Sequence, residues 1–183
     1  MLRLMAILPL AGLASPCRAQ PGKTTLAGMD AYNRGDHGGA FALLRRAGEA
    51  GNGEALANLG YLFARGHGVR QDLIVSLGLY EQAAALGSSE GMNAIGYRHQ
   101  HGNGVPRDPD SAVRWYCRAI ERGNPRAMNN LALMLASGSG VESDLPEALR
   151  LWEQAAALGH AHAMLNLGGA LLQTGRDRLQ GLA

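Results

Sequence analysis

The chain has 183 residues, of which 46% are apolar, 17% are charged and 26 are glycine. This apolar content suits a buried core and excludes a disordered chain, so the many glycines need specific structural positions. Lys and Arg number 17 against 15 Asp and Glu, with no basic run, which excludes the concentrated positive face of a nucleic-acid-binding protein.

Residues 1–19 are typical of a secretory signal peptide. Arg3 precedes an apolar run over residues 4–14, which is shorter than the roughly 20 residues of a membrane span. Cys17 and Ala19 place small residues as a cleavage site requires, which predicts a mature chain in the periplasm or outside a bacterial cell, with no stable membrane insertion. A lipoprotein acylated at Cys17 and a cytosolic chain with an apolar tail remain alternatives.

Residues 20–50 predict a first pair of helices. Apolar residues recur at helical spacing over 26–32 and 40–47, and Gly35 and Asp36 separate the two runs. Gly28 lies 32 residues before Gly60, four fewer than the spacing of the later units. This unit therefore lacks the long loop between its helices and resembles an ordinary tetratricopeptide hairpin.

A 36-residue repeat follows. Gly51, Gly87, Gly123 and Gly159 open the units 51–86, 87–122 and 123–158 and a partial unit 159–175. The Gly-x-Gly-Val loops at 66–69, 102–105 and 138–141 keep the same register. Such a period indicates a solenoid in which each unit packs on its neighbours.

Each full unit predicts two α-helices. In the first unit, apolar residues from Ala55 to Phe63 recur at spacings of three and four, which indicates one buried face. Glycines end the helices, because glycine adopts the left-handed conformation without strain. The glycines predicted to do so are Gly66, Gly102, Gly138, Gly87, Gly123 and Gly159. The second helices are predicted to start at the capping residues Asp72, Asp108 and Asp144.

Three glycines stand inside predicted first helices, where each costs about 1 kcal/mol relative to alanine. They are Gly60, Gly96 and Gly168, and Ala132 takes the same position in the third unit. A cost repeated in register predicts close approach between helices. At the C-terminal end, residues 163–174 predict a first helix without a second one, and residues 176–183 are too short and polar to complete the unit.

These motifs resemble the Sel-one-like repeat, a variant of the tetratricopeptide repeat with a longer loop between its helices. The resemblance covers residues 51–174 closely and 23–50 more loosely. It implies an all-α, right-handed superhelical solenoid whose first helices line a concave face. Family members usually act as adaptors that hold proteins or peptides. In one cysteine-rich secreted branch, members bind penicillin and have β-lactamase activity.

The resemblance also implies which residues face the groove. By alignment with tetratricopeptide domains, these concave-face residues are Glu54, Asn58, Tyr61, Arg65, Glu90, Asn93, Tyr97, His101, Asn129, Asn130 and Leu133. Asn58, Asn130 and Asn166 share a position at which tetratricopeptide domains use asparagine to hold a peptide backbone. The other interpretation is that these side chains are solvated or cap their own repeat. Tyr61 and Tyr97, one repeat apart, are expected to be partner anchors outside the core.

Other patterns have structural explanations. The Gly-x-Gly loops follow helices and lack the Lys-Ser/Thr of a phosphate-binding loop. His99 with His101, and His160 with His162, have a spacing that puts side chains on different helix faces, so no metal site is predicted. Cys117 is predicted to be a partly exposed, unpaired thiol without a special role, and an intermolecular disulfide is the alternative.

The sequence thus favours a non-catalytic scaffold of the bacterial cell envelope that binds an unknown protein or peptide on its concave face, without a cofactor. The alternative is a penicillin-binding or β-lactamase-like enzyme, but Cys17 and Cys117 are the two cysteines of the sequence, too few for disulfides in every repeat. No Ser-x-x-Lys motif is present either. A structural part of the envelope is a third possibility.

The leader predicts that the mature chain begins at Gln20, because the small residues before it suit signal peptidase. The intact mass of the protein isolated from its native host measures this directly. An unprocessed N-terminus, or one carrying acyl chains on Cys17, contradicts the prediction.

Overall fold

The computed structural model describes residues 21–180, so the predicted signal peptide lies outside the described part. Those residues form helices α1–α9 and no strand. The helices are α1 (Pro21–Asn33), α2 (His37–Glu49), α3 (Gly53–Arg65), α4 (Leu73–Ala85), α5 (Ser89–His101), α6 (Pro109–Ile120), α7 (Pro125–Ser137), α8 (Leu145–Ala157) and α9 (Ala161–Gln180). The prediction of an all-α repeat protein is confirmed.

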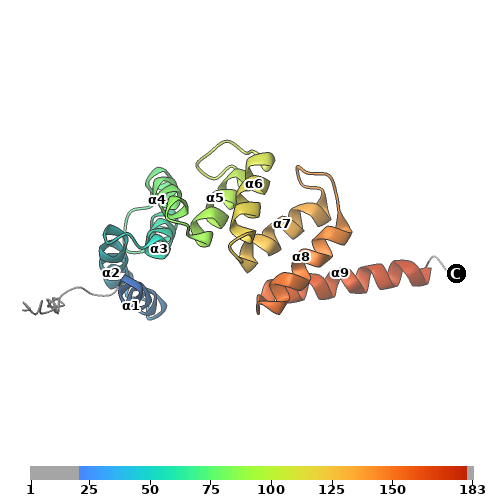
Figure 1. The fold of residues 1–183 in the computed structure, drawn as a ribbon, viewed down its shortest axis with the longest axis horizontal. Helices are drawn as coiled ribbons and strands as arrows, with labels where there is room; N and C mark the ends of the chain where they lie inside the picture. Colours follow the sequence, from blue (N-terminus) through green and yellow to red (C-terminus); the bar gives the residue numbers. More distant parts are fainter. Residues whose placement is uncertain (1–20, 181–183) are drawn as a thin grey trace, which may run out of the picture.

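The helices pack as consecutive pairs along a single arch (Figure 1). Each of α1, α3, α5 and α7 packs most closely on the helix that follows it. In addition, α1, α3 and α5 each contact the next odd-numbered helix, and a hydrogen bond joins Asn129 of α7 to Asn166 of α9. The odd-numbered helices therefore form a continuous row along one side of the arch. Within residues 21–180, no helix combines the length and apolarity needed to cross a membrane.

The first helices of the full units end at the predicted glycines, and the second helices begin at the predicted aspartates. Gly66, Gly102 and Gly138 close α3, α5 and α7 in the left-handed conformation, with φ between 64° and 72°. Aspartate side chains accept hydrogen bonds from backbone N–H groups in the first turns of α4, α6 and α8; these residues are Asp72, Asp108 and Asp144. The sequence reasoning missed a second set of caps, in which Asp36, Asn52, Ser88 and Asn124 serve α2, α3, α5 and α7.

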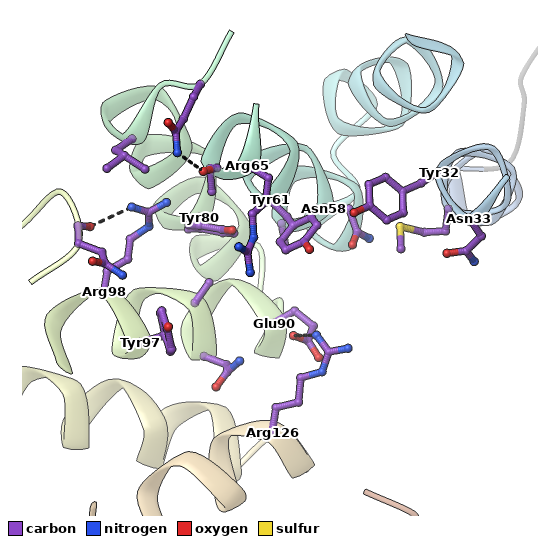
Figure 2. Close-up of a pocket in the computed structure, with 18 residues that line it drawn as sticks. Tyr32, Asn33, Asn58, Tyr61, Arg65, Tyr80, Glu90, Tyr97, Arg98 and Arg126 are labelled. Carbon is purple, nitrogen blue, oxygen red and sulfur yellow. Dashed lines mark hydrogen bonds and ion pairs between the residues drawn. The ribbon is translucent and has the colours of Figure 1, made fainter. Parts of the chain in front are cut away.

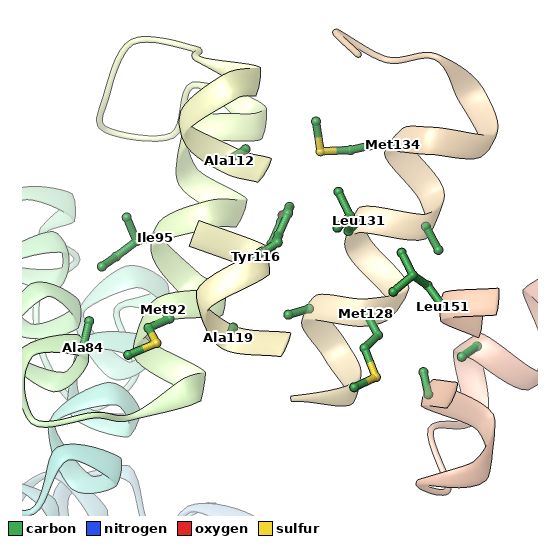
Figure 3. Packing of buried hydrophobic residues seen from close by; sticks show 14 of the residues in the cluster. Ala84, Met92, Ile95, Ala112, Tyr116, Ala119, Met128, Leu131, Met134 and Leu151 are labelled. Carbon is green, nitrogen blue, oxygen red and sulfur yellow. The ribbon is translucent and has the colours of Figure 1, made fainter. Parts of the chain in front are cut away.

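The mid-helix glycines mark close contact with aromatic rings. A Cβ atom on Gly60 would lie 2.9 Å from the ring of Tyr80, and one on Gly96 would lie 2.8 Å from the ring of Tyr116. Tyr116 is fully buried between α5 and α7, among Ile95 and Leu131 (Figure 3). The predicted close approach is therefore confirmed for these two glycines.

Gly168 departs from that prediction, because a Cβ atom added there would meet nothing within 4 Å. No helix in the described residues follows α9 to supply a ring. For the same reason Met164 and Leu165, on the first turns of α9, are exposed. The helix also continues to Gln180, through much of the predicted C-terminal tail, so the expected boundary at residue 175 is not a helix end.

The Gly-x-Gly loops pack on the preceding unit. A Cβ atom on Gly68 would lie 2.5 Å from the carbonyl oxygen of His37, and one on Gly140 would lie 2.5 Å from Pro109. His37 is the first residue of α2, and Pro109 is the first residue of α6. In each case this helix is the second helix of the preceding unit. The second glycine of each loop thus allows one unit to rest on another, which explains the motif without a phosphate.

Replacing Gly102 with valine is expected to destabilise the fold by about 1–3 kcal/mol, because a β-branched residue is strained at a φ of +72°. Surrounding atoms leave ordinary van der Waals space there, so the cost comes from the backbone. Chemical denaturation measures the loss. Gly102→Asn is the control, because asparagine tolerates the left-handed conformation, and equal midpoints for the wild type and the valine variant contradict the assignment.

Candidate functional site

A groove of about 780 Å³ crosses the inner face of the N-terminal half. Helices α1, α3 and α5 supply most of its walls, with α4, α7 and the loops after α3 and α5 contributing the rest. The described residues that line it are Met29, Tyr32, Asn33, Ala57, Asn58, Tyr61, Ala64, Arg65, Gln71, Leu73, Tyr80, Glu90, Asn93, Ala94, Tyr97, Arg98, Asn103 and Arg126.

Six of the eleven predicted concave-face residues line this groove: Asn58, Tyr61, Arg65, Glu90, Asn93 and Tyr97. The other five, Glu54, His101, Asn129, Asn130 and Leu133, do not. These six residues all belong to the first two full units, while Tyr32 of the N-terminal unit and Arg126 of the third full unit line the groove from either side.

Tyr61 is 39% exposed, and neighbouring groups hold its ring in place. The ring of Tyr32 meets it edge-on at 5.9 Å, and the guanidinium of Arg65 lies 5.6 Å from its centre (Figure 2). Tyr32 is itself fixed, because its hydroxyl lies 3.0 Å from Nδ1 of His67. Packing thus presents a large aromatic surface to the groove at little further cost in side-chain entropy.

Tyr97 presents the second aromatic surface and is 45% exposed. The imidazole of His101 stacks on it with the ring centres 4.1 Å apart. Nδ1 of His101 also lies 3.0 Å from the carbonyl oxygen of Tyr97, which fixes the imidazole. His101 therefore supports the groove from outside by orienting Tyr97.

Arginines dominate the charge of the groove. Arg65, Arg98 and Arg126 line it, and Glu90 is the one carboxylate among the described residues that do so. A guanidinium nitrogen of Arg126 lies 3.5 Å from a carboxylate oxygen of Glu90. That pair leaves the positive charges of Arg65 and Arg98 without an acidic counterpart in the groove wall.

The predicted asparagines serve mainly to join repeats. Nδ2 of Asn130 donates to Oδ1 of Asn93 at 3.0 Å, and Nδ2 of Asn166 donates to Oδ1 of Asn129 at 2.9 Å. Asn93 and Asn129 are buried. At Asn130 and Asn166 the shared position thus makes hydrogen bonds to the preceding unit, a contact that the sequence did not predict. Between the first two units, Ala57 and Ala94 take these two positions.

Asn58 differs from the other members of its repeat position. Its side chain lines the groove and makes no hydrogen bond to another residue of the described chain. Its primary amide carries both donors and acceptors, as a peptide backbone requires. A backbone-holding role for Asn58 stays a prediction.

The sequence reasoning missed Tyr32 and Arg98. Tyr32 lies in the unit with the shorter spacing, where the 36-residue register does not apply. Arg98 was detectable, because the 36-residue register aligns it with Leu62 and Met134, and a charged residue among buried aliphatic ones is a clear departure from the repeat.

The remaining candidate groups have local roles. Nδ1 of His160 accepts the backbone N–H of Ala163 at 3.2 Å, and burial lowers the pKa of His160, which favours the neutral form that can accept. Burial raises the pKa of the Cys117 thiol and so reduces its nucleophilic thiolate form. Within residues 21–180, no three His, Cys, Asp or Glu side chains gather as a metal site would require.

Comparison with known proteins identifies the repeat. A profile described as the Sel1 repeat matches residues 28–52, 53–88, 89–124, 125–160 and 161–181, which is most of the chain. This chain belongs to the Sel1 repeat family. The profile includes the N-terminal unit from residue 28 onward, which the sequence reasoning placed closer to the tetratricopeptide repeat. A comparison with curated protein sequences found no match.

Solved Sel1 repeat structures are similar to this chain. A Sel1 repeat protein from Oxalobacter formigenes is 29% identical with a TM-score of 0.72, over 82% of this chain and 63% of the other. A protective antigen of uropathogenic Escherichia coli strains, described as displaying an SLR fold, is 28% identical with a TM-score of 0.66, over 85% of this chain and 34% of the other. This chain thus spans less than two thirds of either protein.

The asparagine pairs predict a measurable coupling. Asn93→Ala is expected to cost about 1 kcal/mol of unfolding free energy, because it leaves the partly buried amide of Asn130 without its partner. The double variant Asn93→Ala/Asn130→Ala copies the Ala57–Ala94 pair and should lose less than the sum of the two single changes. Denaturant unfolding of the four proteins tests this, and strictly additive losses would show that the hydrogen bond contributes nothing.

Proposed function

We propose that this Sel1 repeat protein is a scaffold of the bacterial cell envelope that binds an extended segment of a partner protein in the groove on α1, α3 and α5. The observation that carries the proposal is the pair of exposed, immobilised rings of Tyr61 and Tyr97 on neighbouring first helices. Tyrosine is enriched among binding hot spots, since it offers a large rigid surface with a polar tip.

The spacing of polar groups also favours a peptide. Asn58 and Asn103 belong to adjacent units and both line the groove, as do the three arginines. An extended peptide exposes a backbone donor or acceptor at each residue, so a groove lined by amides over two repeats can satisfy several of them. This arrangement supports recognition of a chain segment over recognition of a compact small molecule.

Catalysis at this groove has little support. Its described lining residues include no Ser, Thr, Cys, His or Lys, which are the usual nucleophiles and bases of acyl transfer. The penicillin-processing alternative would need such a group, and hydrolysis of the chromogenic β-lactam nitrocefin by the purified protein would contradict the scaffold proposal. The envelope location rests on residues 1–19 of the sequence.

Selection from a random peptide library displayed on phage tests the proposal. Peptides selected on the wild-type chain are synthesised, and their dissociation constants are measured by fluorescence anisotropy. Tyr61→Ala/Tyr97→Ala is expected to weaken binding at least tenfold, or about 1.4 kcal/mol, because both aromatic surfaces are lost. Circular dichroism and thermal melting should remain close to wild type, since both rings are partly exposed.

Leu133→Ala is the matched control. Leu133 has the repeat position of Tyr61 and Tyr97 and is exposed, but it does not line the groove, so this variant should bind like wild type. If the tyrosine variant folds and binds as well as wild type, the groove is not the binding site. If it unfolds, the rings belong to the core.

A further inference from the structure

Arg98 is a buried charge at a position where the repeat is aliphatic. It is 4% exposed, and the equivalent residues Leu62 and Met134 are 1% and 0% exposed. Burying an ionised group is costly unless an opposite charge and hydrogen bonds compensate for it. A guanidinium in place of Leu or Met therefore requires a specific explanation.

A second substitution accompanies the first. Ser76 is fully buried on α4, where the equivalent residues Ala112 and Ala148 of the later units are alanine. Nη2 of Arg98 donates to Oγ of Ser76 at 2.7 Å, and that hydroxyl donates to the carbonyl oxygen of Gly60 at 2.6 Å. Ser76 and Arg98 are thus a coupled polar pair at two buried positions that are apolar in the other full units.

The hydrogen bond to Ser76 uses only one of the N–H donors of the Arg98 guanidinium. Besides Ser76, Arg98 donates through Nη1 to the carbonyl oxygen of Asn103 at 2.9 Å, while the buried Nε has no partner. A guanidinium carries five N–H donors, so most of its capacity is unused. Among the described residues, no carboxylate lies within 4.0 Å of it.

The other neighbours of Arg98 compensate for its charge only in part. The ring of Tyr80 lies 5.3 Å from the guanidinium carbon, at which distance an aromatic face attracts a cation. Burial raises the pKa of the Tyr80 hydroxyl, so that group is neutral and supplies no negative charge. The positive charge of Arg98 thus has no negative counterpart within residues 21–180.

Arg98 is one of the residues that line the groove, although it is only 4% exposed. Arg98 and Tyr80 lie toward one end of the groove, and Arg65 enters from α3 between Tyr80 and Tyr61 (Figure 2). Glu90 lies toward the other end, paired with Arg126. Of the two arginines without an acidic partner in the groove wall, Arg98 lies against the ring of Tyr80 and Arg65 against the ring of Tyr61.

We propose that Arg98 forms an anion subsite at the floor of the groove and that the partner is an acidic peptide, one of whose carboxylates reaches Arg98 and Arg65. This inference rests on the proposed function, since it specifies the ligand of the same groove. The carboxylate belongs either to an Asp or Glu side chain or to the C-terminus of the peptide. In both cases the planar guanidinium offers two parallel N–H donors to the two oxygens.

The variant Ser76→Ala/Arg98→Met separates this role from a structural one. It copies the Ala112–Met134 pair of the next unit, so it should fold and melt at or above the wild-type temperature. Peptides selected from the phage library on the wild-type chain should be rich in Asp or Glu, or end in a required free carboxylate. Peptides selected on the variant should lack this preference.

A double-mutant cycle measures the contact directly. Changing the key Glu of a selected peptide to Gln, or amidating its C-terminus, should weaken binding to the wild type about tenfold and leave binding to Ser76→Ala/Arg98→Met unchanged. The Glu-to-Gln arm and the amidation arm identify which carboxylate is bound. Equal sensitivity of both proteins to both changes overturns the anion subsite.

The two proposals can fail separately. If the wild type selects neutral or basic peptides whose binding depends on Tyr61 and Tyr97, the groove function stands and the anion subsite is wrong. If acidic peptides bind with full affinity to Tyr61→Ala/Tyr97→Ala, the groove function is wrong. If the Ser76→Ala/Arg98→Met variant melts well below wild type, Arg98 is a structural residue and the proposal of a ligand subsite is overturned.

Discussion

The contact between a helical glycine and an aromatic ring organises this solenoid. Gly60 meets Tyr80, and Gly96 meets Tyr116, at distances that leave no room for a Cβ atom. Because successive residues of an α-helix are about 100° apart, pressing the glycine against the second helix turns the following residue away from the core. Tyr61 and Tyr97 are those following residues, so the packing that closes each unit also directs a tyrosine to the inner face.

One unit boundary departs from the repeat at two buried positions, Ser76 and Arg98. The buried positions of this chain are mostly Ala, Leu, Ile and Met, and they keep their character from unit to unit. Ser76 and Arg98 depart from that pattern together, and they do so beside the groove. A buried charge lowers stability unless it is compensated, and this cost at one unit alone is the basis of the proposed anion subsite.

The residue pairs that meet between the first helices of neighbouring units also vary along the chain. Asn93 forms a hydrogen bond with Asn130, and Asn129 with Asn166. At the boundary between the first two full units, the equivalent residues are Ala57 and Ala94. Both alanines line the groove. Paired amides would fill this part of the inner face, so the two alanines help to keep the groove open between Tyr61 and Tyr97. At the two later unit boundaries, asparagine pairs joined by hydrogen bonds occupy the equivalent space.

The sequence by itself determined the repeat, its two helices per unit, the glycine stops and the aspartate caps, because these depend on local backbone preferences and on a period that recurs in register. It also placed Tyr61 and Tyr97 on one face. The sequence could not show that Asn93 and Asn130 join across a unit boundary, that Gly168 has no ring to meet, or that Tyr32 reaches Tyr61 from a unit with different spacing. Those contacts join residues more than 25 positions apart or depend on a neighbouring helix, so only the tertiary structure decided them.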